Sequence, residues 1–374
     1  MTTGYAMSDI TPRREHGVSV VIVTRNAERS IGTCLQEVWG QNVASTEVVA
    51  VDSASTDRTV AILEQEYPRT RLLRQARNVG YRDGNIIGMA ASRSRYVLLL
   101  NDDAVLGRDS LRRLISYMDD HPRVALATPM IVMSDDSERI NTAGNRLTAC
   151  GYPSCRGKGA PPLEFCRTGP VAAVSGCCFI ARGSVLDEIG GFSTDFGAYV
   201  TGWHASLEDA DLSARVWLAG YEVHYVAEAV VSHQYSQRQM SPERFASIEF
   251  GRHLLLLRNL HAATLLRLAP ILVGAEAAAF IFALYRGRRY AMAKIKEVAW
   301  IMGHLRIIKD MRLRVQRLRT RPDRELMSLW DTEIELAGAI GGRAGVMIQA
   351  VTSMVLKCYQ RALTGHFADF GKAR

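Results

Sequence analysis

Short apolar runs rich in β-branched residues alternate with segments of helical periodicity over the first hundred residues, and this alternation constrains the fold more than any other feature. Such runs are typical of strands buried on both faces of a sheet. They lie at Val18–Thr24, Glu47–Asp52, Arg71–Gln75 and Tyr96–Leu100. Because helical segments separate them, their order predicts an α/β fold with a mostly parallel sheet flanked by helices.

The segments between and after these strands complete the predicted architecture. Thr56 and Asp57 are suited to cap a helix that Pro68 would end. Residues 134–170 are rich in glycine, proline and polar side chains, which indicates loops with short strands. We further expect helices at 27–41, 56–67, 83–93 and 208–219, and strands at 124–132, 171–181, 222–226 and 229–232.

Small or acidic polar residues follow three of the predicted strands. They are Thr24 to Asn26, Asp52, and Asn101 to Asp103. Since ligands bind at the carboxyl ends of strands in such sheets, these residues should surround one crevice. Carboxylates there can hold Mg²⁺ or Mn²⁺, and such a cation stabilises a diphosphate as a leaving group. The alternative for Asp103 is capping of the next helix, a role that Asp109 fits better.

An acidic cluster and the strand-end Asp52 each have a structural and a chemical interpretation. Glu208, Asp209 and Asp211 open a predicted helix. They either complement the helix dipole or supply a general base whose neighbours tune its pKa. Asp52 either ends a turn or reads the imide N–H of a uracil or thymine base.

Three further side chains are candidates for binding. Trp203 and His204 either pack in the core or form a stacking platform for a sugar ring. His233 follows two short predicted strands, and a lone histidine in such a place is more often structural than a metal ligand.

Cysteine usage bears on the compartment. The chain has seven cysteines, and its first 17 residues contain no apolar leader, which favours a reducing, cytosolic compartment. Four cysteines fall close together in sequence but lack a C-x2-C pair and a neighbouring histidine, so buried thiols are favoured over zinc. They are Cys150, Cys155, Cys166 and Cys177.

Charge divides the chain into two parts. Residues 250–374 contain 21 Lys and Arg against 9 Asp and Glu, whereas the net charge of the whole chain is +8. The first 249 residues are therefore slightly acidic. An apolar content of 48% with 22% charged residues excludes a wholly disordered chain and a polytopic membrane protein. The basic end indicates an anionic partner, either nucleic acid or a membrane surface, or else a solvated helical face.

Two segments of the basic end bear on the choice between these partners. Leu268–Tyr285 is almost wholly apolar but only 18 residues long, and a buried or interfacial helix is favoured over a membrane span. Residues 286–324 carry apolar side chains at three- and four-residue steps, from Val298 to Leu318. This pattern predicts a basic amphipathic helix on an anionic membrane surface, or one packed on the domain or on a second subunit.

Seven segments in order resemble the family 2 glycosyltransferases of the GT-A fold, in particular the rhamnosyltransferase-like branch. The resemblance covers about residues 17–235. It implies a metal-dependent transferase in which a single displacement inverts the anomeric configuration. The segments are VSVVIVTRN (18–26), VDSASTDRT (51–59), RNVGYRDGNIIG (77–88), LLLNDDA (98–104), SGCCFIARGSVLDEIGGF (175–192), EDADLSARVWLAGYEV (208–223) and VVSH (230–233).

The resemblance implies a role for each matching residue. Asp209 is expected to be the catalytic base, and Asp103 the principal ligand of Mg²⁺ or Mn²⁺. His233 is expected to bind the metal or the pyrophosphate. Asn101 stands where many relatives have an Asp, so it binds either the metal or the ribose. The nucleotide is expected to contact Thr24, Asn26, Asp52, Asn78, Gly80 and Asp102, and the acceptor Trp203, His204, Glu208 and Asp211.

The same resemblance implies the substrates and the setting. The donor is expected to be a dTDP- or UDP-sugar, with rhamnose as one candidate, and the acceptor a glycan or lipid-linked saccharide. We expect an N-terminal tail (1–16), a catalytic domain (17–240) and a basic helical region (241–374). We also expect a cytoplasmic protein in peripheral contact with the inner face of the cell membrane, with a homo-oligomer left open.

Competing functions fit the residues less well. A nucleotidyltransferase requires a glycine-rich basic loop after the first strand, and residues 24–30 contain no glycine. A Rossmann dehydrogenase requires G-x-G-x-x-G at the same place. A nucleic-acid-binding protein would use the basic end, but the chain shows no helix-turn-helix, zinc-finger or RNA-binding signature.

Overall fold

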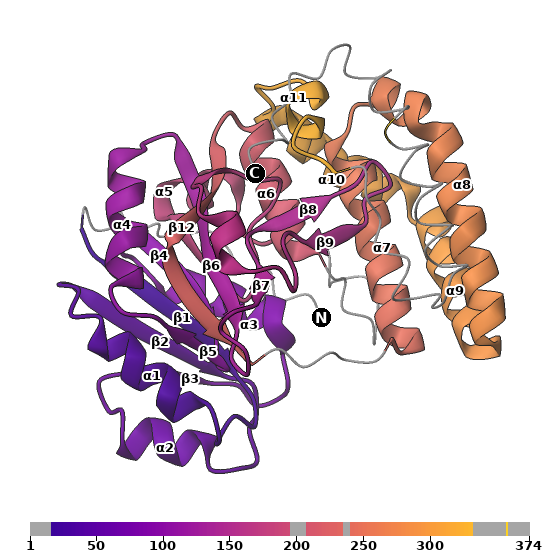
Figure 1. Ribbon diagram of the computed structural model, residues 1–374. Coiled ribbons are helices and arrows are strands. Elements are labelled where there is room, and N and C mark those ends of the chain that lie inside the picture. Colours follow the sequence, from indigo (N-terminus) through magenta and orange to yellow (C-terminus); the bar gives the residue numbers. More distant parts are fainter. Residues whose placement is uncertain (1–15, 195–206, 235–239, 332–356, 358–374) are drawn as a thin grey trace.

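A computed structural model describes residues 16–194, 207–234, 240–331 and 357. A ten-stranded mixed sheet forms its centre, in the order β10-β12-β6-β11-β4-β1-β2-β3, with β5 and β7 paired to β12 and β6 (Figure 1). The strands are β1 (Val18–Thr24), β2 (Thr46–Asp52), β3 (Arg71–Arg74), β4 (Tyr96–Asn101), β5 (Ala104–Leu106), β6 (Val124–Met133), β7 (Ile140–Thr142), β8 (Asn145–Leu147), β9 (Pro153–Cys155), β10 (Gly169–Pro170), β11 (Cys178–Arg182) and β12 (Glu222–His233).

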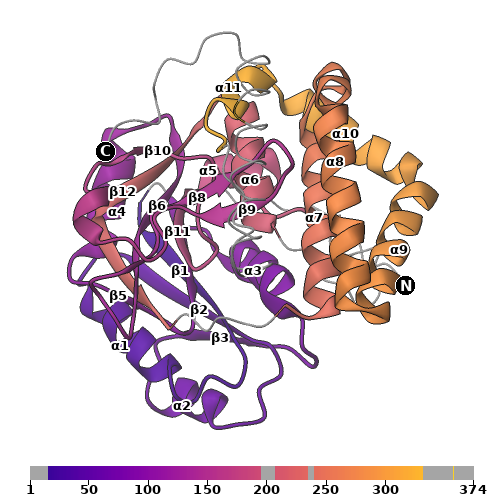
Figure 2. The same ribbon diagram turned by 45° about the vertical axis from the view of Figure 1, so that its right-hand side comes forward.

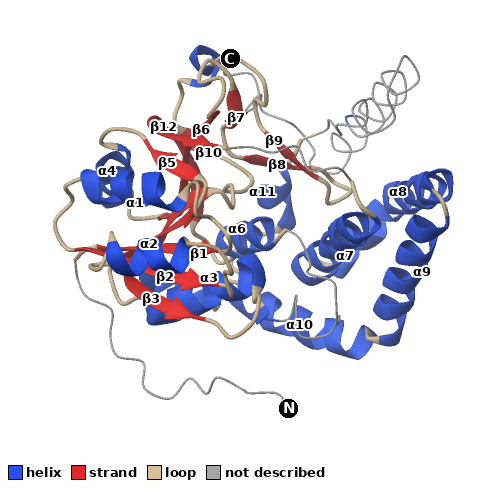
Figure 3. Ribbon diagram, turned by 90° about the horizontal axis from the view of Figure 1, so that it is seen from below, coloured by secondary structure: helices blue, strands red, loops and turns tan. Residues whose placement is uncertain are grey.

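Helices cover both faces of this sheet and form a separate layer beside it. Figure 3 shows α7 to α10 grouped away from the strands. The helices are α1 (Ile31–Gly40), α2 (Thr59–Gln65), α3 (Gly80–Ala91), α4 (Ser110–Asp120), α5 (Gly183–Ile189), α6 (Glu208–Leu218), α7 (Pro242–Asn259), α8 (Ala262–Arg286), α9 (Arg288–Gly303), α10 (Leu305–Leu318) and α11 (Asp323–Met327), with a 3-10 turn at Pro162–Phe165.

The predicted strand–helix alternation is confirmed over β1 to β4. β1 pairs in parallel with both β2 and β4, with Thr24 opposite Asp52 and Val23 opposite Asn101. Because side chains alternate along a strand, β1 contributes Val20 and Ile22 to one core and Val21 to the other. The register brings the carboxyl ends of three strands to the same edge of the sheet.

Two predicted strands differ from the structure. Residues 171–181 were expected to form one strand, but only Cys178–Arg182 does so. In the residues before it, main-chain N–H groups donate to side chains instead of to a neighbouring strand. Val174 N–H donates to Ser213 Oγ, and Gly176 N–H donates to Asp209 Oδ2. The two short strands expected after residue 222 are instead one strand, β12, whose pairing with β6 shifts register between Val226 and Val230.

The segment 286–324 is not one continuous helix. It forms α9, α10 and α11, and much of its apolar stripe is buried inside the protein. Ile301, Ile308 and Met311 pack with Phe250 and Leu254 of α7. Periodicity identifies an apolar face but not what covers it, and here α7 covers it. The alternative that the stripe packs on the domain is therefore the one that the structure shows.

The apolar segment Leu268–Tyr285 belongs to a longer helix, α8, which continues through Pro270. Among the described residues it is the one helix long and apolar enough to cross a membrane. It is not a core helix, because Leu268, Ala279 and Ala283 are its only fully buried residues. In Figure 2, α8 stands beside α7, and it also packs against α9.

Candidate active site

The loops after β1, β2 and β3 are tied together by side-chain hydrogen bonds at the strand-end edge. Asn26, whose φ is 53°, donates its N–H to Ser55 Oγ at 3.0 Å and accepts from Thr56 N–H at 2.8 Å. Ser53 Oγ donates to Asn78 Oδ1 at 2.9 Å. Asn78 Oδ1 also accepts from Gly80 N–H at 3.0 Å, which fixes the start of α3. These bonds preorganise a polar cradle at the edge where the nucleotide residues were predicted.

Thr24 and Asp52, the last residues of β1 and β2, are buried at this cradle. The Asp52 carboxylate accepts from Ser55 N–H at 3.2 Å, so it holds the turn that follows β2. The structural interpretation of Asp52 is thus supported by a contact. Its predicted contact with a base remains a prediction.

The predicted metal ligands lie at the end of β4 (Asn101), just after it (Asp103) and at the end of β12 (His233). The β5–β12 pairing sets His233 opposite Ala104, and His233 Nε2 lies 3.2 Å from Asp103 Oδ1. His233 Nδ1 lies 3.2 Å from Asn141 Oδ1. Asp103 Oδ1 is buried and has no well-oriented hydrogen bond. An acidic oxygen and an imidazole nitrogen that face each other in this way are suitable ligands for one divalent cation.

Asp102 and Asn101 lie next to Asp103 in sequence and make different hydrogen bonds. Asp102 Oδ2 accepts from Arg25 N–H at 3.3 Å, which ties it to the end of β1. Burial, reinforced by the neighbouring charge of Asp103, raises the pKa of Asp102. The Asn101 main chain donates its N–H to the carbonyl of Cys177 at 2.9 Å. The nucleotide half of the edge is thereby joined to the segment before β11.

The predicted base lies at the start of α6. Asp209 Oδ2 accepts from Gly176 N–H at 3.0 Å and from Asn145 Nδ2 at 3.4 Å. Oδ1 accepts from Ala210 N–H at 2.8 Å. Burial raises the pKa of Asp209, although these hydrogen bonds to the ionised form oppose the shift. The carboxylate is therefore held in one orientation while its proton affinity is increased.

Tyr81 links the segment that holds Asp209, the predicted general base, to the predicted nucleotide-binding edge. From the first turn of α3, its hydroxyl donates to the carbonyl of Gly176 at 2.6 Å. A Cβ at position 176 would lie 3.1 Å from the Tyr81 hydroxyl and 3.4 Å from Asp209 Oδ2, so only glycine fits without a shift. Tyr81, Asn145 and Gly176 were not singled out from the sequence. The signal for two of them was their place inside the matching segments 77–88 and 175–192.

Glu208 precedes Asp209, the predicted base, at the start of α6. Burial, with a contribution from the charge of Asp209, raises the pKa of Glu208 to about 8. Its Oε2 is buried without a hydrogen-bond partner among the described residues. A carboxyl in this state is protonated near neutral pH.

Glu208→Gln should therefore change how stability depends on pH. With a folded pKa of about 8 against 4.5 for an ordinary glutamate, the folded state loses stability as pH rises between these values. The variant lacks this titration. Its melting temperature should exceed that of the wild type by several degrees at about pH 8 and by much less at about pH 5. Thermal unfolding across pH, with the exposed Glu66→Gln as control, checks this; a difference independent of pH would contradict it.

Asp211 is not brought to the site. It is buried and lies 2.9 Å from Arg215 Nε and 3.2 Å from Arg258 Nη2, and Asn259 Nδ2 donates to it at 3.0 Å. Burial alone would raise its pKa, but Arg258 and Arg215 lower the pKa of Asp211. This carboxylate joins α6 to α7, and the predicted acceptor role does not suit its position. Trp203 and His204 lie outside the described residues.

Asp211→Ala should therefore destabilise the fold rather than alter substrate binding. It leaves two buried guanidinium groups without their common partner, and breaking a buried pair in this way costs about 3–5 kcal/mol. Urea unfolding should show a loss of that size, against little change for the exposed Asp120→Ala. A loss below about 1 kcal/mol, typical of surface pairs, would contradict the assignment.

Comparisons with known proteins agree with this architecture. The profile of Glycosyl transferase family 2 matches residues 19–190. An N-acetylglucosaminyltransferase of Bradyrhizobium elkanii is 30% identical over 127 residues, which cover 32% of this chain and 69% of that protein. The chain belongs to glycosyl transferase family 2. The resemblance inferred from the seven segments is thus confirmed, and the protein is a glycosyltransferase.

Two further similarities bear on the branch and the fold of this glycosyltransferase. An N-acetylglucosaminyl-diphospho-decaprenol L-rhamnosyltransferase of Mycobacterium tuberculosis is 26% identical over 253 residues, 61% of this chain and 76% of that protein. The crystal structure of GalNAc-T7 with UDP, GalNAc and Mn²⁺ superposes with a TM-score of 0.51 at 15% identity, covering 66% of this chain and 48% of that one. The second similarity supports the GT-A fold.

Proposed function

We propose that this glycosyltransferase moves a sugar, with rhamnose the leading candidate, from a dTDP- or UDP-sugar to a hydroxyl of a lipid-linked saccharide. The proposal includes inversion at the anomeric carbon and dependence on a divalent cation. The identity of the donor sugar follows the rhamnosyltransferase of M. tuberculosis, whose name also specifies a lipid-linked acceptor. A dTDP and a UDP donor present the same imide edge, so Asp52 does not choose between them.

One observation carries the proposal: two consecutive residues join the two halves of the site. Gly176 N–H binds the carboxylate of Asp209, while the carbonyl of Cys177 accepts from Asn101, at the end of β4. Asp209 and the metal-ligand segment are thus held by two consecutive residues, Gly176 and Cys177. A donor whose diphosphate meets Asp103 would have its anomeric carbon on the side of Asp209, as in-line displacement requires.

The cation site rests on the Asp103–His233 pair. When bound there, Mg²⁺ or Mn²⁺ would neutralise charge that develops on the departing diphosphate. The pair offers one carboxylate and one imidazole, and Asn101 and Asp102 are further candidates nearby. Oxygens of the diphosphate would supply other ligands, as is common for Mg²⁺ at phosphate sites.

The chain's own residues then take up the acceptor proton and keep the base oriented. Asp209 takes the proton of the acceptor hydroxyl as that oxygen bonds to the anomeric carbon. Its raised pKa makes it a stronger base than an ordinary aspartate, and the Gly176 and Asn145 contacts keep it aimed. Glu208, protonated near neutral pH, is available to hydrogen-bond an acceptor oxygen, which retains its proposed acceptor role.

We also propose the setting that the chain's two parts indicate. Residues 17–240 would form the catalytic domain and residues 241–374 a basic helical region in contact with the cytoplasmic face of the membrane. Such a location fits a lipid-linked acceptor.

A ligand screen tests the proposal without turnover. Thermal unfolding is measured with dTDP, UDP, GDP and ADP, each with and without Mn²⁺, and with duplex DNA. We expect dTDP or UDP with Mn²⁺ to raise the melting temperature by several degrees, since a ligand at about 100 times its Kd adds about 2.7 kcal/mol. Stabilisation by DNA alone would overturn the proposal in favour of a nucleic-acid-binding protein.

A further inference from the structure

Large apolar side chains are exposed on both helices of the α8–α9 hairpin. On α8, Leu266 is 76% exposed and Tyr285 is 85% exposed. Leu266, Val273 and Leu284 share a face, because spacings of seven and eleven residues are close to whole helical turns. Contiguous exposed apolar side chains of this kind mark an interaction surface. The hairpin face consists of Leu266, Val273, Ile281, Leu284 and Tyr285 of α8 with Met292 and Ile295 of α9.

Basic side chains border the hairpin face where α8 turns into α9. Arg288, Arg289 and Lys296 line one pocket, together with Met292 and a single acidic residue, Glu243. All three basic side chains are exposed. An exposed tyrosine and several arginines beside an apolar helical face are the residue types found at the boundary between a bilayer and water.

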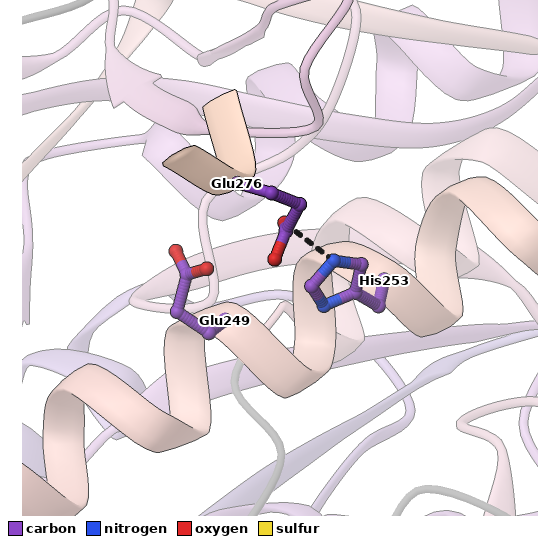
Figure 4. Close-up of side chains that lie close together, drawn as sticks. All are labelled: Glu249, His253 and Glu276. Atoms are coloured by element: carbon purple, nitrogen blue, oxygen red, sulfur yellow. Dashed lines mark hydrogen bonds and ion pairs between the residues drawn. The ribbon is translucent and has the colours of Figure 1, made fainter. Parts of the chain in front are cut away.

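A buried ionic cluster fixes the orientation of α8 and argues against a transmembrane path. Glu276, near the middle of α8, is 29% exposed and pairs with three residues of α7 and α9. Figure 4 shows its pair with His253, with Glu249 nearby. His253 Nε2 lies 2.7 Å and Lys294 Nζ 2.8 Å from its carboxylate, and Arg252 is the third partner. Lys294 and Arg252 are fully buried and also pair with Glu249.

This cluster makes insertion of α8 across a bilayer costly. Spanning would either pull Glu276 away from Arg252 and Lys294, which leaves buried charges unpaired, or carry the whole ionic cluster into hydrocarbon. Neither cost arises if the hairpin lies on the membrane with its outer face in the headgroup region. The geometry therefore favours an interfacial helix over a span.

We propose that the hairpin face binds an anionic phospholipid bilayer, and that Arg288, Arg289 and Lys296 take lipid phosphates. Charge complementarity selects this occupant over a second copy of the chain. In a two-fold dimer through this surface the same basic residues would face their own copies or lie close to them. The inference deepens the proposed membrane partner of the enzyme, but vesicle binding is measured without turnover, so the two proposals fail separately.

Vesicle co-sedimentation tests the inference on the full-length chain. Binding is measured to phosphatidylcholine vesicles with and without phosphatidylglycerol, at low and high salt. We expect binding to the anionic vesicles, weakened by salt. The triple charge reversal Arg288→Glu, Arg289→Glu and Lys296→Glu should weaken that binding by ~100-fold, as each surface charge changes affinity several-fold. Ile281→Asp with Leu284→Asp should weaken it at high salt as well.

Matched controls separate the surface from general charge and apolarity. Arg108→Glu, Arg112→Glu and Arg123→Glu make the same charge change in α4 and the loops that flank it. Helix α4 lies on the opposite side of the molecule from α8 and α9 in Figure 1. Leu163→Asp replaces an apolar side chain that is 86% exposed in the loop before β10. Both controls should bind vesicles like the wild type.

Three outcomes would overturn the inference. In the first, the hairpin variants bind anionic vesicles as tightly as the controls. In the second, the wild type resists extraction from membranes at high salt and alkaline pH, which indicates a span. In the third, sedimentation shows a dimer that Ile281→Asp with Leu284→Asp dissociates, which assigns the face to a second copy.

Discussion

Asp209→Asn should lower kcat by ~1,000-fold while donor affinity stays within a few-fold of the wild type. Asparagine keeps the shape of the side chain and can still be oriented by neighbouring groups, but it cannot take the acceptor proton. Loss of a positioned general base costs about 10²–10⁴-fold in rate. Initial rates of nucleoside diphosphate release, with donor affinity from calorimetry, check both parts of this expectation.

The exposed Asp120→Asn is the matched control for this substitution, because it makes the same chemical change at the end of α4. A wild-type rate in the control and a large loss in the variant would assign the effect to position 209. Near-wild-type transfer by Asp209→Asn would show that another group takes the proton.

Asp103→Ala should abolish the response to divalent cations and lower transfer by ~100-fold or more. The substitution removes the carboxylate that faces His233, and a metal at such a site supplies several kcal/mol of transition-state stabilisation. Mn²⁺ should then no longer strengthen dTDP or UDP binding in calorimetry, a readout that does not require turnover.

His233→Ala serves as a companion to this experiment. If Asp103 and His233 hold one cation, the double variant should lose little more than either single variant, because the two losses are coupled. Unchanged metal titration in Asp103→Ala would remove the metal assignment from this pair. It would leave the role of Asp209 standing, since that residue is tested by its own variant.

The sequence predicted correctly those strands and strand-end residues that depend on residues close together in the chain. Val18–Thr24 and Tyr96–Leu100 are runs dominated by β-branched and aliphatic residues, and such runs are typical of strands buried on both faces. Asp103 and His233 were predicted from matching segments, and the β5–β12 pairing brings them together although they are far apart in sequence. Parallel pairing then brings Thr24, Asp52 and Asn101 to one edge without further information.

Other features depend on long-range contacts that periodicity does not contain. Asp211 was predicted to contact the acceptor together with its neighbour Glu208. It instead pairs with Arg258 of α7 inside the protein. The stripe through Ile301 and Ile308 could pack on lipid or on protein, and only the position of α7 decides. Gly176 lies in a segment whose residues predict a strand. Its N–H donates to Asp209 instead of to a neighbouring strand.

Acceptor-dependent release of nucleoside diphosphate tests whether the enzyme transfers a sugar from a dTDP- or UDP-sugar with Asp209 as its base. The enzyme is incubated with Mn²⁺, a lipid-linked N-acetylglucosaminyl diphosphate, and in turn dTDP-rhamnose and a set of other dTDP- and UDP-sugars. We expect the wild-type enzyme to release nucleoside diphosphate from at least one of these donors, and only when the acceptor is present. Asp209→Asn should lose this release. Absence of acceptor-dependent release from every dTDP- and UDP-sugar, or equal release by Asp209→Asn, would contradict it.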